Sequence, residues 1–231
     1  MPFDFSRFEY LSFDCYGTLI DWERGILGYL QPLLASKGGS ASDDQILNLY
    51  SEFEPREQSG SYRGYREVLA SVVRDFACEL HFEVNDAEAN GLAASIAGWE
   101  PFPDTVAAFE RLHQRYKLAV LSNIDDDLFR LTAPKLRVPL AAIVTAQQAR
   151  GYKPSIGNFE LLLQTLGIPR ERLMHVAESL YHDVAPARSL GIATVWVNRR
   201  QARPAAASRL ADVRPDVEVK NVAELADLAG C

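Results

Sequence analysis

The chain has 231 residues, of which 48% are hydrophobic and 24% are charged, the balance of a globular protein with one large domain or a domain that carries an insertion. This composition excludes a disordered tail protein, a collagen-like fibre and a small disulfide scaffold. The net charge of −7 offers no basic face for nucleic acid or an anionic membrane, and no apolar stretch reaches the roughly eighteen residues of a transmembrane helix. An anionic substrate would therefore need a local pocket to attract it.

The beginning of the chain and its cysteines bear on the cellular compartment. The first residues show no basic segment followed by an apolar block, so we expect no secretory signal. Cys15, Cys78 and Cys231 are scattered, without the paired spacing of disulfides or of a zinc site. A reducing, cytoplasmic location fits this pattern best.

Short apolar runs that each end at polar or glycine residues predict buried β-strands. The segments between them show helical spacing, as after Asp104, which we expect to cap a helix, and over residues 158–164 and 183–190. Strands that alternate with helices predict an α/β fold with a doubly wound, Rossmann-like parallel sheet covered on both faces. The predicted strands are residues 10–13, 117–121, 142–145, 173–177, 192–197 and 217–219.

The segment between the first two predicted strands is far longer than a crossover of about a dozen residues requires. From residue 21 to 99 its apolar residues recur at three- and four-residue spacing, with turn-like breaks at Gly38 and Gly60. We therefore expect residues 21–99 to form an inserted helical cap, and residues 1–20 and 100–231 to form the core. Residues 200–215, rich in Ala, Arg and Pro, are expected to form a surface loop.

Polar residues follow the predicted strands at one edge of the sheet. Because ligands of open parallel sheets bind outside the carboxyl ends of the strands, these side chains should meet in one crevice. A carboxylate there can attack a substrate while a lysine and backbone amides balance the charge, as covalent catalysis requires. The residues are Asp14, Ser122, Asn123, Lys153, Glu178 and Asp183.

Four segments that carry these residues resemble the ordered motifs of the haloacid dehalogenase superfamily. They are residues 13–19 (FDCYGTL), 121–123 (LSN), 152–154 (YKP) and 178–183 (ESLYHD). The long helical insert after the first motif is similar to the cap domain of that superfamily. The resemblance implies a nucleophilic aspartate at Asp14, binding of the substrate anion at Ser122 and Asn123, a charge-neutralising Lys153, and a positioning role for Asp183 in ester hydrolysis.

Tyr16 bears on the type of reaction. Most phosphatases of the superfamily carry a second aspartate at this position, which protonates the leaving alkoxide and then activates water. A phenol with an ordinary pKa of about 10 is a poor substitute, whereas a halide leaves carbon without a proton. The first motif is also similar to that of the 2-haloacid dehalogenases. We therefore predict hydrolysis of a small 2-haloalkanoic acid through an ester on Asp14, without metal or other cofactor, and with Tyr16 among the substrate-binding residues.

Glu178 departs from the dehalogenase pattern, in which small polar residues tend to occupy its position. Phosphatases place an acid there to hold Mg²⁺, so Asp14, Glu178 and Asp183, with the carbonyl of residue 16, form a candidate octahedral site. Alternatively, Glu178 contributes to substrate binding or pairs with Lys153. A Mg²⁺-dependent phosphatase acting on a small phosphoester and a non-catalytic ligand-binding protein are therefore alternative functions. The resemblance also makes a homodimer one of the assembly states to test.

Two groups of charged residues outside the motifs admit structural explanations. Residues 125–127 are all aspartate and follow the second strand at an expected helix start, where the helix dipole favours negative charge, so capping is the better account for at least two of them. Arg56, Arg63 and Arg66 lie in the insert, where the dehalogenases carry an arginine that helps to bind the substrate carboxylate or the departing halide. Their spacing does not identify the equivalent residue, and a surface helix would carry such charges too.

Overall fold

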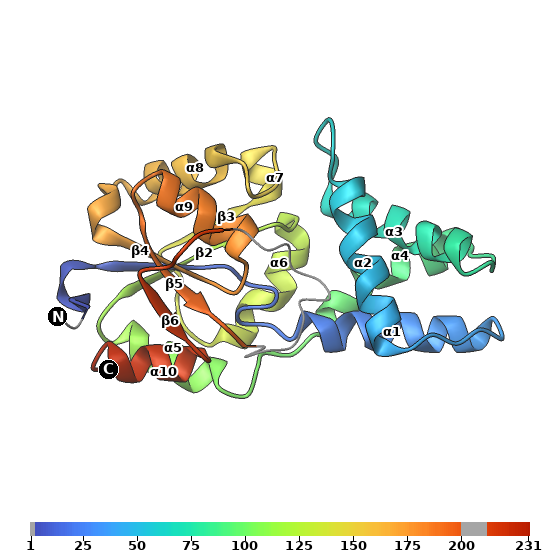
Figure 1. Cartoon of the computed structure of the whole chain (residues 1–231), viewed down its shortest axis with the longest axis horizontal. Helices are drawn as coiled ribbons and strands as arrows, with labels where there is room; N and C mark the ends of the chain where they lie inside the picture. Colours follow the sequence, from blue (N-terminus) through green and yellow to red (C-terminus); the bar gives the residue numbers. More distant parts are fainter. Residues whose placement is uncertain (1–2, 200–211) are drawn as a thin grey trace.

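The computed structural model describes residues 3–199 and 212–231 and contains a six-stranded parallel sheet (Figure 1). The strand order, β3-β2-β1-β4-β5-β6, is that of a Rossmann-like doubly wound sheet, so the predicted α/β fold is confirmed. Residues 200–211, most of the predicted surface loop, lie outside the described residues. The strands are β1 (Tyr10–Phe13), β2 (Lys117–Ser122), β3 (Ala142–Thr145), β4 (Leu173–Ala177), β5 (Ala193–Val197) and β6 (Val217–Val219).

The register of the middle strands places their carboxyl ends side by side. Phe13 of β1 pairs with Val120 of β2 and Val176 of β4, and the Asp14 N–H continues the pairing by donating to the Val176 carbonyl. These strands are buried on both faces, which is why their sequences read as apolar runs rather than alternating patterns. The residues that follow β1, β2 and β4 are therefore brought to one edge of the sheet.

Helices cover both faces of the sheet (Figure 1). Phe159 of α8 and Ala187 of α9 join one apolar cluster with β2 and β3, and Phe109 of α5 and Leu225 of α10 join a second, larger cluster. The described part of the chain has no helix with the length and apolar character needed to cross a membrane. The core helices are α5 (Thr105–His113), α6 (Asp126–Thr132), α7 (Ala146–Ala149), α8 (Ile156–Leu166), α9 (Ala185–Ser189) and α10 (Val222–Leu228).

Two predicted helix starts differ from the structure in detail: α5 begins after Asp104 as predicted but without a side-chain cap, and the helix predicted from Asp183 begins later. Asp104 is the N-cap residue of α5, but its side chain makes no capping bond. Its carboxylate accepts from the two terminal guanidinium nitrogens of Arg199, at 2.9 and 3.2 Å, and from the Val222 N–H. The helix expected to begin at Asp183 is α9, which begins at Ala185. It follows directly on a helical turn, Leu180–Val184, whose first residue is preceded by Ser179, and the Ser179 side chain caps that turn. Asp183 therefore lies within that turn and is buried.

The insert folds as a helical cap subdomain beside the sheet (Figure 1). Phe53 and Phe76 meet edge-to-face between α2 and α3, with ring centroids 5.3 Å apart. The breaks predicted at Gly38 and Gly60 fall between helices, where both glycines have positive φ. We propose residues 21–99 as the extent of this cap. Its helices are α1 (Trp22–Ser36), α2 (Asp43–Glu57), α3 (Tyr65–Glu79) and α4 (Asp86–Ser95).

Asp125 fastens the cap to the core. Asp126 and Asp127 lie in the first turn of α6 as predicted, but Asp125 makes no capping bond to that helix. Its carboxylate instead accepts the backbone N–H groups of Tyr65 and Arg66, each at 2.9 Å, at the start of α3, where the N-cap residue is a glycine without a side-chain cap. The core thus supplies the capping carboxylate that α3 lacks.

Replacing Asp125 by alanine should lower the free energy of unfolding by about 1 kcal/mol, since two N–H groups at the start of α3 lose their acceptor. Asp127→Ala is the matched control, because its main partner is Arg66 in an exposed ion pair worth less than about 1 kcal/mol. Denaturant unfolding of both variants measures the difference. Equal losses for the two variants would contradict the capping role of Asp125.

Candidate active site

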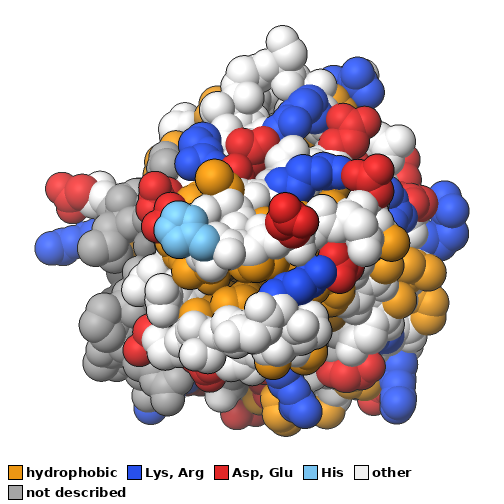
Figure 2. Space-filling view, turned by 90° about the vertical axis from the view of Figure 1, so that its right-hand side faces the viewer, with side chains coloured by type: hydrophobic (Ala, Val, Ile, Leu, Met, Phe, Trp, Pro, Cys, Tyr) orange, Lys and Arg blue, Asp and Glu red, His pale blue; other side chains and the backbone are white. Residues whose placement is uncertain are grey.

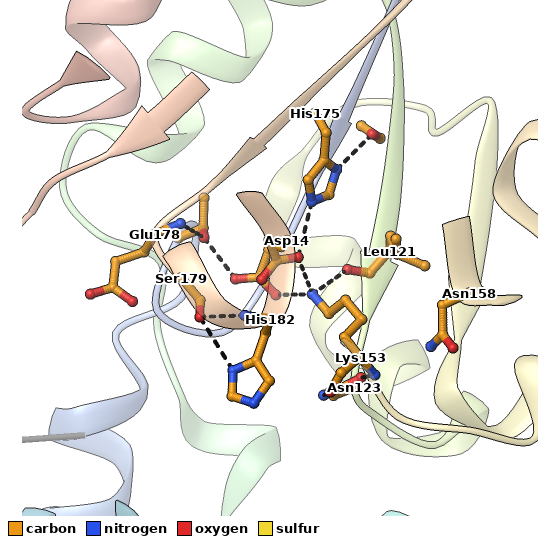
Figure 3. Close-up of polar contacts among 12 residues, drawn as sticks. Asp14, Leu121, Asn123, Lys153, Asn158, His175, Glu178, Ser179 and His182 are labelled. Atoms are coloured by element: carbon orange, nitrogen blue, oxygen red, sulfur yellow. Dashed lines mark hydrogen bonds and ion pairs between the residues drawn. The ribbon is translucent and has the colours of Figure 1, made fainter. Parts of the chain in front are cut away.

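Asp14 lies at the centre of the polar groups at this sheet edge (Figure 3). Its side chain is buried, and each carboxylate oxygen accepts one hydrogen bond, Oδ1 from Lys153 Nζ at 2.8 Å and Oδ2 from Thr18 Oγ1 at 2.7 Å. The turn that returns Thr18 to Asp14 passes through Gly17 at a φ of 98°, a conformation that favours glycine. Burial raises the pKa of Asp14 above its ordinary value, while the Lys153 charge opposes that rise.

Lys153 is buried between two carboxylates. Its three N–H donors are used by Asp14 Oδ1, Asp183 Oδ1 and the Leu121 carbonyl, at 2.8, 2.6 and 3.0 Å. Burial alone would lower the pKa of Lys153, but the two carboxylates outweigh it and hold the pKa above its ordinary value. The side chain is therefore a cation, and all of its donors are engaged.

Asn123 holds the backbone of Lys153 in place. Its Oδ1 accepts the Lys153 N–H at 2.7 Å and its Nδ2 donates to the Lys153 carbonyl at 3.2 Å. The amide predicted to bind substrate is thus occupied in tying the loop after β3 to the end of β2. Ser122 differs, because its Oγ is buried and has no hydrogen-bond partner among the residues that the structure describes.

Asp183 anchors the far side of the lysine. One of its oxygens, Oδ1, accepts from both Lys153 Nζ at 2.6 Å and His175 Nε2 at 2.9 Å. Burial by itself would raise the pKa of Asp183, but Lys153 and His175 lower it to about 2. Asp183 is therefore an anion across the physiological range.

Sequence reasoning missed three residues that support these groups. His175 on β4 and Ser12 on β1 are opposite one another in the sheet register, and Ser12 Oγ lies 2.8 Å from His175 Nδ1. A signal was present, because each is a polar residue within an otherwise apolar buried strand, where it needs a hydrogen-bond partner. Thr18, quoted only as part of a motif, donates to Asp14 and accepts the Glu178 N–H.

Tyr16 points toward the cap connection. Its hydroxyl lies 2.8 Å from Thr132 Oγ1, and its ring meets Trp99 edge-to-face. Burial raises the pKa of Tyr16 well above its ordinary value, so the phenol stays protonated. This position therefore supplies no general acid of ordinary strength, and a substrate contact of Tyr16 stays a prediction.

Glu178 is half-buried at the end of β4, and its carboxylate is directed away from Lys153 (Figure 3). Since the three lysine donors are taken, the predicted alternative of a Glu178–Lys153 ion pair is not formed. Burial, together with the charges of Asp14 and Asp183, raises the pKa of Glu178 to about 8.

The residues predicted to hold Mg²⁺ do not fit that role. Within residues 3–199 and 212–231, no group of three histidine, cysteine or acidic side chains is placed to bind a metal ion. Asp14 and Asp183 share Lys153 between them, and the carboxylate of Glu178 is turned away from them. A hard cation prefers several ionised oxygen ligands directed at one point, which this set does not provide.

The three cap arginines are paired with acids. Arg56 binds Asp75 at 2.7 Å, Arg63 binds Glu57 at 2.7 Å, and Arg66 binds Asp127 at 2.5 Å. In the view onto the cap (Figure 2), basic and acidic side chains lie interspersed over the surface. Substrate binding by one of these arginines would need it to leave its partner, and it stays a prediction.

A model of the haloacid dehalogenase-like hydrolase family matches residues 9–191, which include Asp14, Lys153 and Asp183. The chain belongs to this family. It is therefore a hydrolase, and the matched segment contains the lysine-bridged pair of carboxylates at the carboxyl edge of the Rossmann-like sheet.

Relatives of known activity cover nearly the whole chain. Haloacetate dehalogenase H-2 of Moraxella sp. (strain B) is 26% identical over 199 residues, 84% of this chain and 87% of that protein. The (S)-2-haloacid dehalogenase H-109 of Pseudomonas putida is 24% identical over 225 residues, 95% of this chain and 96% of that protein. The structure of the L-2-haloacid dehalogenase from Xanthobacter autotrophicus with chloropropionic acid covalently bound has a TM-score of 0.83 at 17% identity, covering 96% of this chain and 98% of that chain, and shares its fold.

Replacing Glu178 by glutamine should change the pH dependence of stability. The pKa of Glu178 rises from 4.5 to about 8 on folding, so the native state binds the Glu178 proton more tightly than the unfolded state does. Protonation of Glu178 therefore adds to the free energy of unfolding at low pH, and this stabilisation is lost as pH rises from about 4.5 through 8. Glutamine does not titrate, so the melting temperature of Glu178→Gln, relative to that of the wild type, should increase between pH 5 and pH 8. A difference that stays constant with pH would show that Glu178 is ionised in the native state.

Proposed function

We propose that this hydrolase removes halide from C2 of a small 2-haloalkanoic acid through an ester on Asp14, without a metal ion. The observation that carries the proposal is the Asp14 carboxylate, buried at the sheet edge with a donor on each oxygen. Its neighbour Tyr16 lacks the acidity that an alkoxide leaving group would require. The dehalogenase activities named for two relatives, which cover most of this chain, support the same reaction.

The first step needs no proton transfer. An oxygen of Asp14 attacks C2, the new C–O bond forms as the carbon–halogen bond breaks, and the halide leaves with the bonding electrons. Asp14 and the substrate carboxylate are both anions, so the Lys153 cation offsets their repulsion as they approach. The Oγ of Ser122, which is buried and unpaired among the described residues, is available to donate to the substrate carboxylate.

The second step hydrolyses the ester. Water attacks Cγ of Asp14, the bond between Cγ and the ester oxygen breaks, and a 2-hydroxy acid leaves while one proton passes to solvent. Whichever oxygen of Asp14 has reacted, the other retains a donor, Lys153 on Oδ1 or Thr18 on Oδ2. That donor stabilises the negative charge that develops on the carbonyl oxygen of the ester. Asp183 contributes by holding Lys153.

A Mg²⁺-dependent phosphatase is the second candidate, and Glu178 is the observation that favours it. An acid stands where phosphatases of this superfamily hold a metal ion. The orientation of the Glu178 carboxylate argues against metal binding, and Tyr16 argues against protonation of a leaving alkoxide. Screening small phosphoesters with Mg²⁺ tests this candidate directly.

We expect the wild-type protein to release halide from racemic 2-chloropropionate and from bromoacetate in the presence of EDTA. Asp14→Asn should reduce the rate by at least about a thousandfold, because the amide is not a nucleophile. Cys15→Ala is the matched control, since Cys15 is buried beside Asp14 and has no part in the reaction, and it should retain activity within a few-fold of the wild type. Ion chromatography of released halide measures all three proteins.

Two results would overturn this proposal. Halide release that persists in Asp14→Asn would exclude the ester on Asp14. No halide release from the wild type, together with Mg²⁺-dependent release of phosphate from a small phosphoester, would establish the phosphatase instead.

A further inference from the structure

A chain of buried hydrogen bonds runs from the middle of the sheet to the nucleophile (Figure 3). Ser12 Oγ lies 2.8 Å from His175 Nδ1, His175 Nε2 lies 2.9 Å from Asp183 Oδ1, and the same oxygen accepts from Lys153, which donates to Asp14. Ser12 and His175 are 0% exposed, and Asp183 is 1% exposed. The catalytic lysine is therefore connected to β1 and β4 through two residues that the reaction does not touch.

The direction of these hydrogen bonds follows from the chemistry of their groups. Asp183 is ionised and can only accept, so His175 Nε2 must carry a proton and donate it. At the other ring nitrogen, Nδ1, the Ser12 hydroxyl lies 2.8 Å away and can either donate or accept.

These three residues have the composition of a hydrolytic Ser-His-Asp triad but cannot act as one. The serine is buried between neighbouring strands, at a register position where no substrate reaches it. The aspartate is also already bound to Lys153. Burying three polar side chains in an apolar sheet is costly unless each is hydrogen-bonded, so their arrangement points to a role in holding Asp183.

We propose that His175 and Ser12 are positioning residues for the catalytic lysine. Lys153 faces two carboxylates, and its ammonium stays on Asp14 only if Asp183 keeps its place on the other side. His175 fixes Asp183 from β4, and Ser12 fixes the ring of His175 from β1. Without the imidazole donor, Asp183 is free to rotate about its side-chain bonds and to draw Lys153 away from Asp14.

The first experiment measures the contact between Lys153 and Asp14 in the absence of substrate. Crystal structures of His175→Phe and His175→Gln are compared, because Phe fills the space of the ring without a donor, whereas the Gln amide can donate to Asp183. We expect the 2.8 Å contact between Lys153 Nζ and Asp14 Oδ1 to be lost in the Phe variant and kept in the Gln variant. An unchanged contact in His175→Phe would overturn the proposal, whatever the substrate proves to be.

The second experiment rests on the function proposed above and measures kcat and KM for 2-chloropropionate. A displacement of about 1 Å at a catalytic group can cost about a hundredfold, so His175→Phe should lower kcat by that order while KM changes less than about threefold. His175→Gln should recover most of the loss, and Ser12→Ala should show a smaller fall in kcat than His175→Phe.

Thr194→Val is the control for a purely structural effect. Thr194 is the neighbour of His175 on β5, is equally buried, and uses its hydroxyl to bind Asp216, away from the site. It should lower the melting temperature without lowering kcat. If Thr194→Val reduced kcat as much as His175→Phe does, or if glutamine gave no rescue, the positioning role would be overturned. If the wild type released no halide, the proposed substrate would fail, and the crystal structures would still decide the role of His175.

Discussion

The ammonium of Lys153 between the carboxylates of Asp14 and Asp183 is the interaction on which the rest of the site depends. Taking three charges out of water costs several kcal/mol per ion, and their attraction offsets that cost only when the geometry is good and the remaining donors and acceptors are satisfied. Here every lysine donor is used, and each carboxylate has a second donor, Thr18 on Asp14 and His175 on Asp183. The same arrangement places the Asp14 carboxylate beside a cation, as the proposed attack on an anionic substrate would require.

The register of the parallel strands brings these three side chains together. Since β1, β2 and β4 are parallel and end at the same level, the residues after them meet without long loops. Asn123, after β2, then fixes the backbone of Lys153, so the loop after β3 also converges on Asp14. The cap is tied to the same edge, because Asp125 follows β2 closely and caps α3. The segment that follows β2 thus both positions Lys153, through Asn123, and attaches the cap, through Asp125.

Much of the fold and the centre of the site could be predicted from the sequence. Apolar runs ending in polar residues located the strands, and parallel order brought Asp14, Lys153 and Asp183 together. What local pattern could not reveal were partners distant in sequence. Asn123 was predicted to bind the substrate anion, which stays a prediction, and the pattern did not reveal that its amide binds the Lys153 backbone. His175 and Ser12 are far apart in the chain, and only the strand register pairs them. The prediction for residues 125–127 concerned at least two of them, and it did not reveal that Asp125 accepts the N–H groups at the start of α3.

The covalent ester on Asp14 is the central claim, and a single turnover in H₂¹⁸O tests it most directly. With enzyme in excess over 2-chloropropionate, water attacks Cγ of Asp14, so the first ¹⁸O enters the Asp14 carboxylate and the 2-hydroxy acid is released unlabelled. Mass spectrometry of the peptide that contains Asp14 should show the added mass. If the label appeared in the product of the first turnover and not in the peptide, water would have attacked C2 directly, and Asp14 would not be the nucleophile.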